Sequence, residues 1–213
     1  MSGSTAAARR LRLVALAIAG ALGCDETPDA APASEAAAPA VAPAEPTAVD
    51  LNGAPVDPFG GDAKAIALVF LGRDCPISNR YAPELARIRE GFGKDVAWFL
   101  VFPDPDDDAA AIERHLAEYG LRGPAIRDPL HVLVKKSAVH VTPESAVFVR
   151  DGGGVKRVYA GRIDDRWVDY GRARPAARTH ELADAITAAL AGLAPKASDV
   201  PGVGCPIDDL LPS

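Results

Sequence analysis

One strand–turn–helix pattern in the middle of the chain limits what this sequence can fold into. The apolar run Ala65–Leu71 leads into a short polar turn that carries Cys75, and a helix-like pattern with an internal proline, Pro83, follows at once. An unbroken apolar run predicts a strand buried on both faces, as in parallel or mixed sheets with helices on either side. The thiol of Cys75 is therefore expected at a helix N-terminus, directly after a buried strand.

The remaining patterns of the segment 49–194 alternate between strands and helices. The pair Asn52-Gly53 between apolar positions predicts a β-hairpin. After Cys75 we expect a helix with Tyr81, Leu85, Ile88 and Phe92 on its inner face, which Gly91 and Gly93 end, then a strand at 96–102 and a helix with Ile112, Leu116 and Tyr119 on its inner face. A strand at 125–127 and a short helix at 130–138 follow. The segments 145–149 and 155–160 are expected to form a hairpin, and the last helix has Leu182, Ile186, Leu190 and Leu193 on one face. This order predicts one α/β domain with a central mixed sheet and helices on both faces.

The first 24 residues are typical of an export signal. Three arginines precede the apolar run Leu13–Leu22, which is shorter than the about 20 residues that span a bilayer. The ending Ala21-Leu22-Gly23-Cys24 resembles a bacterial lipoprotein signal in which Cys24 becomes lipidated; ordinary cleavage before Cys24 and an uncleaved anchor are the alternatives. Residues 25–48 are almost all Ala, Pro, Glu, Asp, Ser and Thr, which predicts a disordered tether.

Composition excludes several classes of function. The chain has 213 residues and a net charge of −6, without a basic stripe, so a nucleic-acid partner is not expected. His115, His131 and His180 show no metal-ligand spacing with one another or with the cysteines, and no zinc or haem motif is present. We therefore expect neither a metal nor another cofactor.

Two motifs carry a resemblance to thioredoxin-fold proteins. The segment from Cys75 to Pro83 resembles the active-site strand–turn–helix of that family, in which a helix-kinking proline stands five residues after the second cysteine of a Cys-x-x-Cys motif. Here Ser78 replaces that second cysteine, and Pro83 stands five residues later. Thr142-Pro143, before a predicted strand, resembles the second family signature, a cis proline beside the active-site thiol. The resemblance implies a thioredoxin-like fold over roughly residues 50–193.

A narrower resemblance points to exported bacterial redoxin-like proteins, which are grouped with alkyl hydroperoxide reductases and thiol-specific antioxidant proteins. It rests on the segments 74–84 and 161–166. Peroxiredoxins have proline seven residues and Thr or Ser three residues before the peroxidatic cysteine, whereas this chain has Leu68 and Gly72 there. The resemblance therefore implies thiol redox chemistry without the peroxidase pattern.

Physical chemistry makes Cys75 the expected nucleophile. A helix N-terminus presents unpaired N–H groups and a partial positive charge, which favour the thiolate. The Ser78 hydroxyl, one turn later, can donate a hydrogen bond to the sulfur; Arg73 and Arg80 would add positive field, and Asp74 would oppose it. The alternative is that Cys75 is a small buried apolar residue at a strand end.

Cysteine counting points to a partner for Cys75. If Cys24 is lipidated, Cys75 and Cys205 remain as a pair in an oxidising compartment. Cys205 lies in the Pro- and Gly-rich tail 195–213, beyond the last helix, where a thiol has no packing role. We hypothesise a redox-active disulfide between the two on a mobile tail; the alternatives are that Cys205 bonds another protein or docks the tail without redox work.

Other polar residues are weaker candidates. His140, three residues before Pro143, is either a proton shuttle or a partly buried histidine at a strand entrance. Asp164 and Asp165 either shape substrate access or belong to a salt-bridged turn. Trp167 and Tyr170 form either an exposed binding surface or packing under a loop.

Three functional hypotheses follow. The leading one is an exported thiol–disulfide oxidoreductase, lipid-anchored through Cys24 at the periplasmic face of the envelope. The expected substrates are protein thiols and disulfides: Cys75 would attack a substrate disulfide, and Cys205 would resolve the adduct, with Ser78, Thr142 and Pro143 around the site. An external thiol would reduce the enzyme. The second is a thiol peroxidase that passes through sulfenic acid. The third is a redox-inactive thioredoxin-fold binding module.

Overall fold

The computed structural model describes residues 48–207. The predicted signal, Cys24 and almost all of the predicted tether 25–48 lie outside this range, as does the end of the tail. Among the described residues, no helix has the length and apolar character needed to cross a membrane.

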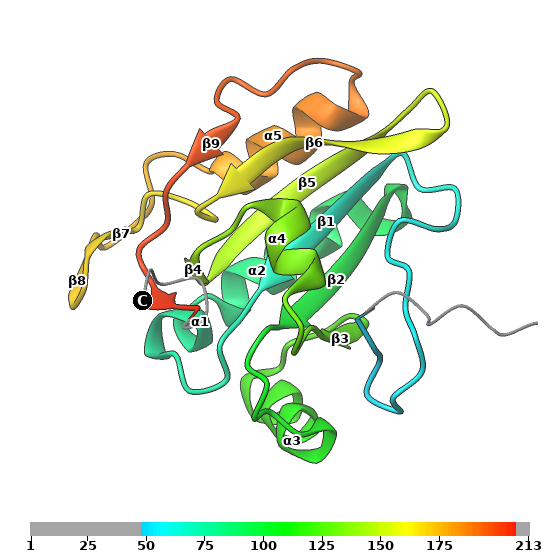
Figure 1. Ribbon diagram of the computed structural model, residues 1–213. Coiled ribbons are helices and arrows are strands. Elements are labelled where there is room, and N and C mark those ends of the chain that lie inside the picture. The colour runs from blue at the N-terminus through cyan, green and yellow to red at the C-terminus, as the bar shows by residue number, and fades with distance from the viewer. Residues whose placement is uncertain (1–47, 208–213) are drawn as a thin grey trace, which may run out of the picture. The chain divides into compact units, whose positions relative to one another are not determined.

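A six-stranded mixed sheet forms the centre of the domain (Figure 1). Its strands lie in the order β3-β2-β1-β5-β6-β9, with parallel pairing among β1, β2 and β3, antiparallel pairing of β5 with β1 and β6, and parallel pairing of β9 with β6. The strands of this sheet are β1 (Ala65–Phe70), β2 (Val96–Phe102), β3 (Ala125–Arg127), β5 (Glu144–Asp151), β6 (Gly154–Gly161) and β9 (Asp199–Val200).

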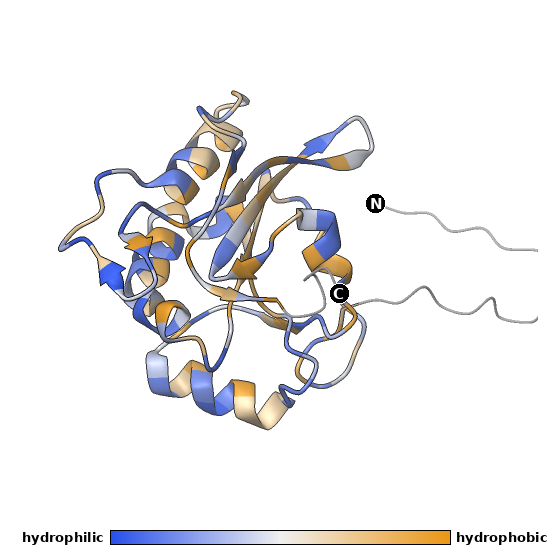
Figure 2. Cartoon of the chain, turned by 60° about the vertical axis from the view of Figure 1, so that its left-hand side comes forward, coloured by the Kyte–Doolittle hydropathy of each residue, from blue (hydrophilic) through white to orange (hydrophobic). Residues whose placement is uncertain are grey.

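Helices cover both faces of the sheet. Successive residues of β1 point to opposite faces, and the residues on each face pack against different helices. Ala67 and Val69 belong to a core cluster that includes residues of α2 and α5, whereas Ile66 and Leu68 belong to a second cluster that includes residues of α4. The helices are α1 (Pro76–Arg80), α2 (Ala82–Phe92), α3 (Ala109–Tyr119), α4 (Val132–Ser137) and α5 (Glu181–Leu190), with a 3-10 turn, η1 (Gly93–Asp95), after α2. Figure 2 shows hydrophobic segments in the sheet and hydrophilic segments on the outer helices and loops.

This arrangement confirms the α/β class, the mixed sheet and the thioredoxin-like fold. Four short strands lie outside the main sheet: β4 (Val141–Thr142) pairs with β10 (Cys205–Pro206), and β7 (Trp167–Asp169) pairs with β8 (Arg172–Ala173). Both pairs lie near the end of the sheet where β1 leads into α1 (Figure 1).

Several local predictions need correction. The Asn52-Gly53 turn forms, but Val49 makes only isolated bridges to Pro55 and Arg127 rather than a hairpin. On α3 the buried face holds Ile112 and His115, and Tyr119 is exposed. His115 therefore belongs to the inner face of α3, which the apolar spacing alone did not indicate.

Two helix ends also differ from the prediction. Gly91 lies within α2, and Gly93, with a φ of 55°, ends that helix. The last helix ends before Leu193, which is exposed, because the chain turns at Ala191 and Gly192. The apolar spacing continued past the point where the backbone hydrogen bonds of the helix stop.

Candidate active site

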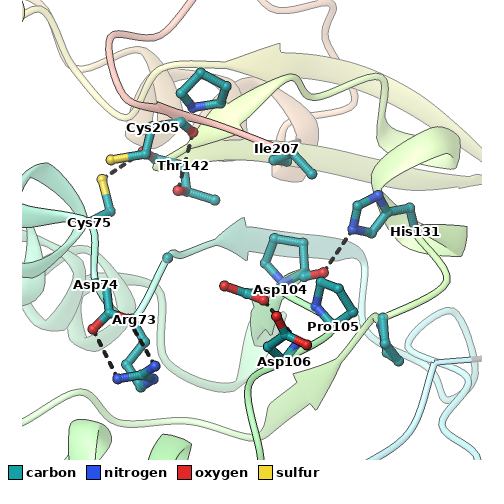
Figure 3. A pocket seen from close by; sticks show the side chains of 14 residues that line it. Arg73, Asp74, Cys75, Asp104, Pro105, Asp106, His131, Thr142, Cys205 and Ile207 are labelled. Carbon is teal, nitrogen blue, oxygen red and sulfur yellow. Dashed lines mark hydrogen bonds and ion pairs between the residues drawn. The ribbon is translucent and has the colours of Figure 1, made fainter. Parts of the chain in front are cut away.

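The end of β1 and the start of α1 fix the position of Cys75. The residue caps α1 with an extended backbone, and Pro76 occupies the first helical turn, where a missing N–H costs no hydrogen bond. The break at Tyr81 separates α1 from α2, and Pro83 lies in the first turn of α2. Only 3% of Cys75 is exposed, so the thiol is buried, and Figure 3 shows its sulfur directed toward Cys205.

The chain that enters β5 passes directly over this thiol. The Cys75 thiol donates a hydrogen bond to the carbonyl oxygen of Thr142 at 3.1 Å, and the peptide bond between Thr142 and Pro143 is cis. Gly72 makes this close approach possible, because a Cβ there would lie 2.7 Å from Thr142 Oγ1. The two motifs that the sequence analysis singled out are therefore in contact.

Cys205 lies across from Cys75 on the returning tail. In the β4–β10 pair it stands opposite Thr142, and Thr142 Oγ1 donates to the Cys205 carbonyl oxygen at 3.4 Å. Figure 3 shows the two sulfur atoms pointing toward each other. Both cysteines are free thiols in this structure. The Cys205 side chain is half-buried, so it is the more accessible of the two.

The two thiols have opposite pKa shifts. Burial raises the pKa of Cys75, but hydrogen bonds from the Cys205 thiol and from the N–H and hydroxyl of Ser78 outweigh it and hold the pKa below its ordinary value. Burial and the hydrogen bond to Cys75 raise the pKa of Cys205 to about 11, although Tyr170 acts in the other direction. Cys75 therefore loses its proton first, and Cys205 is the donor that stabilises its thiolate.

Besides its hydrogen bond to Cys75, Ser78 has a structural role in the turn before α1. It is 1% exposed, and its hydroxyl oxygen accepts a hydrogen bond from the Gly72 N–H at 3.2 Å. The hydroxyl can therefore brace the turn and donate to the sulfur at once. The position that carries a second cysteine in related motifs is thus used for holding the first one.

A buried carboxylate, which the sequence analysis did not single out, holds the tail in place. Glu144 is 4% exposed, and its two oxygens accept hydrogen bonds from Gly202 N–H at 2.8 Å and His140 N–H at 2.8 Å. Val141 N–H adds a longer contact of 3.4 Å to the same carboxylate. Glu144 thereby joins β4 to the chain that leads to Cys205. No sequence pattern singles out one carboxylate next to a predicted strand.

Backbone packing leaves no room for a Cβ at two glycines, one on the docked tail and one on β6 beside it. A Cβ at Gly204 would lie 2.2 Å from the Thr142 carbonyl oxygen, and one at Gly161, whose φ is 135°, would lie 1.9 Å from the Val200 carbonyl oxygen. Tail residues also pair with β6, since Ala160 N–H donates to the Ser198 carbonyl and Arg162 N–H to that of Val200. The tail expected to be mobile is docked along residues 198–207.

Tyr170 is a further contact of the second thiol. Its hydroxyl lies 3.1 Å from Cys205 Sγ, although 60% of the residue is exposed on the turn between β7 and β8. Trp167, at the base of this turn, is 9% exposed, and the Arg80 guanidinium lies 5.7 Å from the centre of its ring. Trp167 therefore packs and Tyr170 reaches the site, while Arg80 faces the indole ring.

A pocket of about 410 Å³ opens beside the sulfurs. It lies between the tail on one side and the turn after β2 on the other (Figure 3). Its walls include Cys75, Thr142, Cys205, Ile207, Pro103, Asp104, Pro105, Asp106, Arg73, Asp74 and His131. Arg73 pairs with Asp107 at 2.7 Å and with Asp74 at 2.9 Å, so its charge is balanced by two carboxylates.

The remaining candidates lie away from the sulfurs. His140 is exposed and lines a different cavity. Its backbone N–H donates to the Glu144 carboxylate, and its backbone carbonyl accepts from Ile207 N–H. Asp164 accepts hydrogen bonds from the Tyr81 hydroxyl at 2.6 Å and from Arg166 N–H at 2.8 Å. Asp165 accepts from Arg178 and Thr179 N–H. Both aspartates therefore hold loops.

Glu84, Asp164 and His180 are the group of three potential metal ligands found in residues 48–207, with ligand atoms within 4.8 Å of one another. Its oxygens already accept hydrogen bonds from Arg87 and Tyr81. The group therefore belongs to the hydrogen bonds made by Tyr81 and Arg87, and not to the thiol site.

Comparisons with known proteins support the fold. No family model matches the chain, and neither does any curated protein. A crystal structure of an uncharacterized conserved protein from Geobacillus kaustophilus is similar, with 24% identity, a TM-score of 0.60, and coverage of 76% of this chain and 86% of that one. A hypothetical protein from Sinorhizobium meliloti has 23% identity and a TM-score of 0.51, over 68% of this chain and 80% of that one.

A more remote solved structure belongs to a protein with a stated activity. A secreted disulfide oxidoreductase from Mycobacterium tuberculosis has 22% identity and a TM-score of 0.45, over 69% of this chain and 95% of that one. What the comparisons and the topology together establish is that the chain has a thioredoxin-like α/β fold.

Proposed function

We propose that this protein is an exported thiol–disulfide oxidoreductase in which Cys75 is the nucleophile and Cys205 is the resolving thiol. The observation that carries the proposal is the facing pair of thiols, one with a lowered and one with a raised pKa, held together by the β4–β10 pair. Such a pair assigns the two steps of a disulfide exchange to two different sulfurs.

The proposed reaction balances without a cofactor. The Cys75 thiolate attacks one sulfur of a substrate disulfide; a Cys75–substrate bond forms, and the other substrate sulfur leaves as a thiolate that takes up a proton. Cys205 then loses its proton and attacks Cys75 Sγ, which releases the second substrate thiol and leaves a Cys75–Cys205 disulfide. An external thiol reductant attacks the half-buried Cys205 sulfur, forms a mixed disulfide there and releases Cys75, which takes up a proton or stays as the thiolate. A second reductant thiol then attacks the reductant sulfur of that mixed disulfide, which releases Cys205 as a thiol and leaves the reductant as a disulfide.

Thiol peroxidase chemistry has less support. Peroxiredoxins place Thr or Ser three residues before the reactive cysteine, and here that position is Gly72, where a Cβ would lie 3.0 Å from Cys75 Cβ and 2.7 Å from Thr142 Oγ1. Leu68, at the position of the motif proline, is fully buried in β1. The turn is built for contact with Thr142 rather than for a hydroxyl that would bind peroxide.

Export and anchoring belong to the same proposal. The signal pattern of residues 1–24 supports export, and Cys24 is the proposed lipidation site, with residues 25–48 as the tether that lets the domain work away from the membrane. Periplasmic placement agrees with a working disulfide, because the cytosol keeps thiols reduced.

A trapping experiment tests this proposal. In full-length Cys205→Ala, the adduct on Cys75 has no resolving thiol, so a mixed disulfide with a disulfide substrate should accumulate and be seen as a mass increase on the Cys75 peptide. The double variant Cys75→Ser/Cys205→Ala is the control for reactions at Cys24. If Cys75 forms no adduct and the domain still binds partners, the protein is a redox-inactive binding module instead.

A further inference from the structure

We propose that the substrate of this thiol is a small disulfide with positive or no net charge, rather than a disulfide in a polypeptide. The inference rests on the proposed function and specifies its substrate class. It follows from three features that surround Cys75: an occupied strand edge, a pocket of limited size, and an excess of carboxylates at its walls.

The strand edge nearest the sulfur is already occupied by the tail. Extended peptides bind most readily by adding a strand to a free sheet edge. Here β4, whose Thr142 carbonyl touches the Cys75 thiol, pairs with β10 through Cys205 opposite Thr142 and Pro206 opposite Val141. Ile207 N–H extends the pairing to the His140 carbonyl at 3.1 Å. A substrate polypeptide would have to displace this segment before its disulfide could reach Cys75.

The docked segment is fixed rather than loosely laid on the domain. Gly204 fits against the Thr142 carbonyl only because it lacks a Cβ, and Glu144 holds the Gly202 N–H from below. β9 continues the main sheet next to β6. The tail therefore closes the edge and at the same time forms one wall of the pocket, through Cys205, Pro206 and Ile207.

The route left open is the pocket. Its volume of about 410 Å³ lies in the range of small-molecule sites, which is roughly 300–1,000 Å³. Pro103, Pro105 and Ile207 give it apolar surface, and Cys75, which is only 3% exposed, is one of the residues that line it. A linear disulfide of a few carbon atoms fits such a space, and a folded chain does not.

Charge at the pocket selects among small disulfides. Asp74, Asp104 and Asp106 line it against the single guanidinium of Arg73, which is itself paired with Asp74 and with the buried Asp107. Figure 3 places Asp104 and Asp106 across the pocket from the two sulfurs. A negative pocket raises the local concentration of cations and lowers that of anions. Disulfides with terminal amines are therefore favoured over those with terminal carboxylates.

The test measures the first step alone, in full-length Cys205→Ser, by the rate at which Cys75 releases one equivalent of thiol. Three disulfides of similar size are compared: cystamine, bis(2-hydroxyethyl) disulfide and 3,3′-dithiodipropionate. Each rate is divided by the rate of the same disulfide with free mercaptoethanol, which removes differences in intrinsic reactivity. Cys75→Ser/Cys205→Ser supplies the blank for Cys24.

We expect the corrected rate for cystamine to exceed that for dithiodipropionate by about tenfold or more at low salt. Adding Asp104→Asn and Asp106→Asn, which keep size and remove charge, should bring the ratio to within about threefold of unity. Equal corrected rates in the starting protein would overturn the charge selection.

The polypeptide arm uses insulin. With the tail docked, insulin should react about a hundredfold more slowly than bis(2-hydroxyethyl) disulfide after the same correction, because access limits exchange. Gly204→Ala, placed in the same Cys205→Ser protein, should release the tail and raise the insulin rate at least about tenfold, with a far smaller effect on the small disulfide. Insulin reacting as fast as the small disulfide in the docked protein would overturn the inference and leave the proposed function standing. Reaction with none of the disulfides would overturn both.

Discussion

The two cysteines meet at one point but are held there by very different parts of the molecule. Cys75 follows a fully buried strand of the central sheet and caps a helix, so the core of the domain fixes it. Cys205 lies on a two-residue strand, held by main-chain pairing and by the Glu144 carboxylate. The nucleophile thus lies between a central strand and a helix, whereas the second thiol lies on a short tail segment that packs onto the domain through residues such as Val203 and Ile207.

The largest expected effect comes from removing the nucleophile. Cys75→Ser should abolish disulfide exchange while it leaves the fold in place, because the hydroxyl fits the space of the thiol but is not ionised at neutral pH. Stopped-flow measurement of thiol release from a small disulfide, with circular dichroism as the folding control, checks this. Residual exchange that Cys205 alone supports would show that the two roles are assigned the wrong way round.

Detaching the second region should have the next largest effect. Glu144→Gln keeps the size of the side chain but replaces one acceptor oxygen of the carboxylate by an amide donor, which cannot accept from both the His140 and the Gly202 N–H. We expect a loss of roughly 1–3 kcal/mol in the free energy of unfolding.

Formation of the Cys75–Cys205 disulfide in this variant should slow by about tenfold, since the effective concentration of the two thiols falls. Reaction of Cys75 with iodoacetamide should change much less. Glu113→Gln, at an exposed position of α3, is a matched control for a lost carboxylate. Equal slowing in both variants would remove Glu144 from the account.

The pH dependence of Cys75 tests the coupling between the regions. Its lowered pKa means that the thiolate is populated at a lower pH than in an ordinary cysteine, so the alkylation rate should reach its plateau at lower pH. Cys205→Ala removes the strongest hydrogen bond that lowers this pKa, and the inflection should therefore move to higher pH. An inflection that stays in place would show that Ser78 and the helix start alone set the pKa.

Tyr170→Phe should have the smallest effect. Its hydroxyl lies at Cys205 Sγ and holds the pKa of that thiol down, so its loss should raise the Cys205 pKa and slow disulfide closure by about two- to fivefold. The reaction of Cys75 with a small disulfide in the Cys205→Ser protein should be unaffected. A change there would mean that Tyr170 acts on substrate entry instead.

The same contrast explains what the sequence could predict. The buried strand 65–70, the kink at Pro83 and the approach of Thr142 to Cys75 were predictable, because long apolar runs and prolines carry strong local signals. The pairing of β10 with β4 was not, since two-residue strands have no periodicity and their pairing spans about sixty residues of chain.

Individual residues show the same limit. Counting cysteines identifies Cys205 as a candidate but does not predict the docking of the tail around it. The role of Glu144 is not predictable, because a single carboxylate forms no recognisable sequence pattern. Tyr170 was open between a surface and a packing role, and only the fold brings its hydroxyl to 3.1 Å from Cys205 Sγ. The roles of residues that the core fixes can be predicted from the sequence. The roles of residues on the tail and on the β7–β8 turn cannot, because they depend on tertiary contacts.

The most direct test is to map the disulfide itself. The exported full-length protein is oxidised mildly, digested without reduction and analysed by mass spectrometry beside a reduced sample. The account predicts that one peptide pair joins Cys75 to Cys205 and that the domain loses two hydrogens in mass, with the bond restored to two thiols by dithiothreitol. Two free thiols after oxidation, or a bond from either cysteine to another molecule in place of this one, would contradict it.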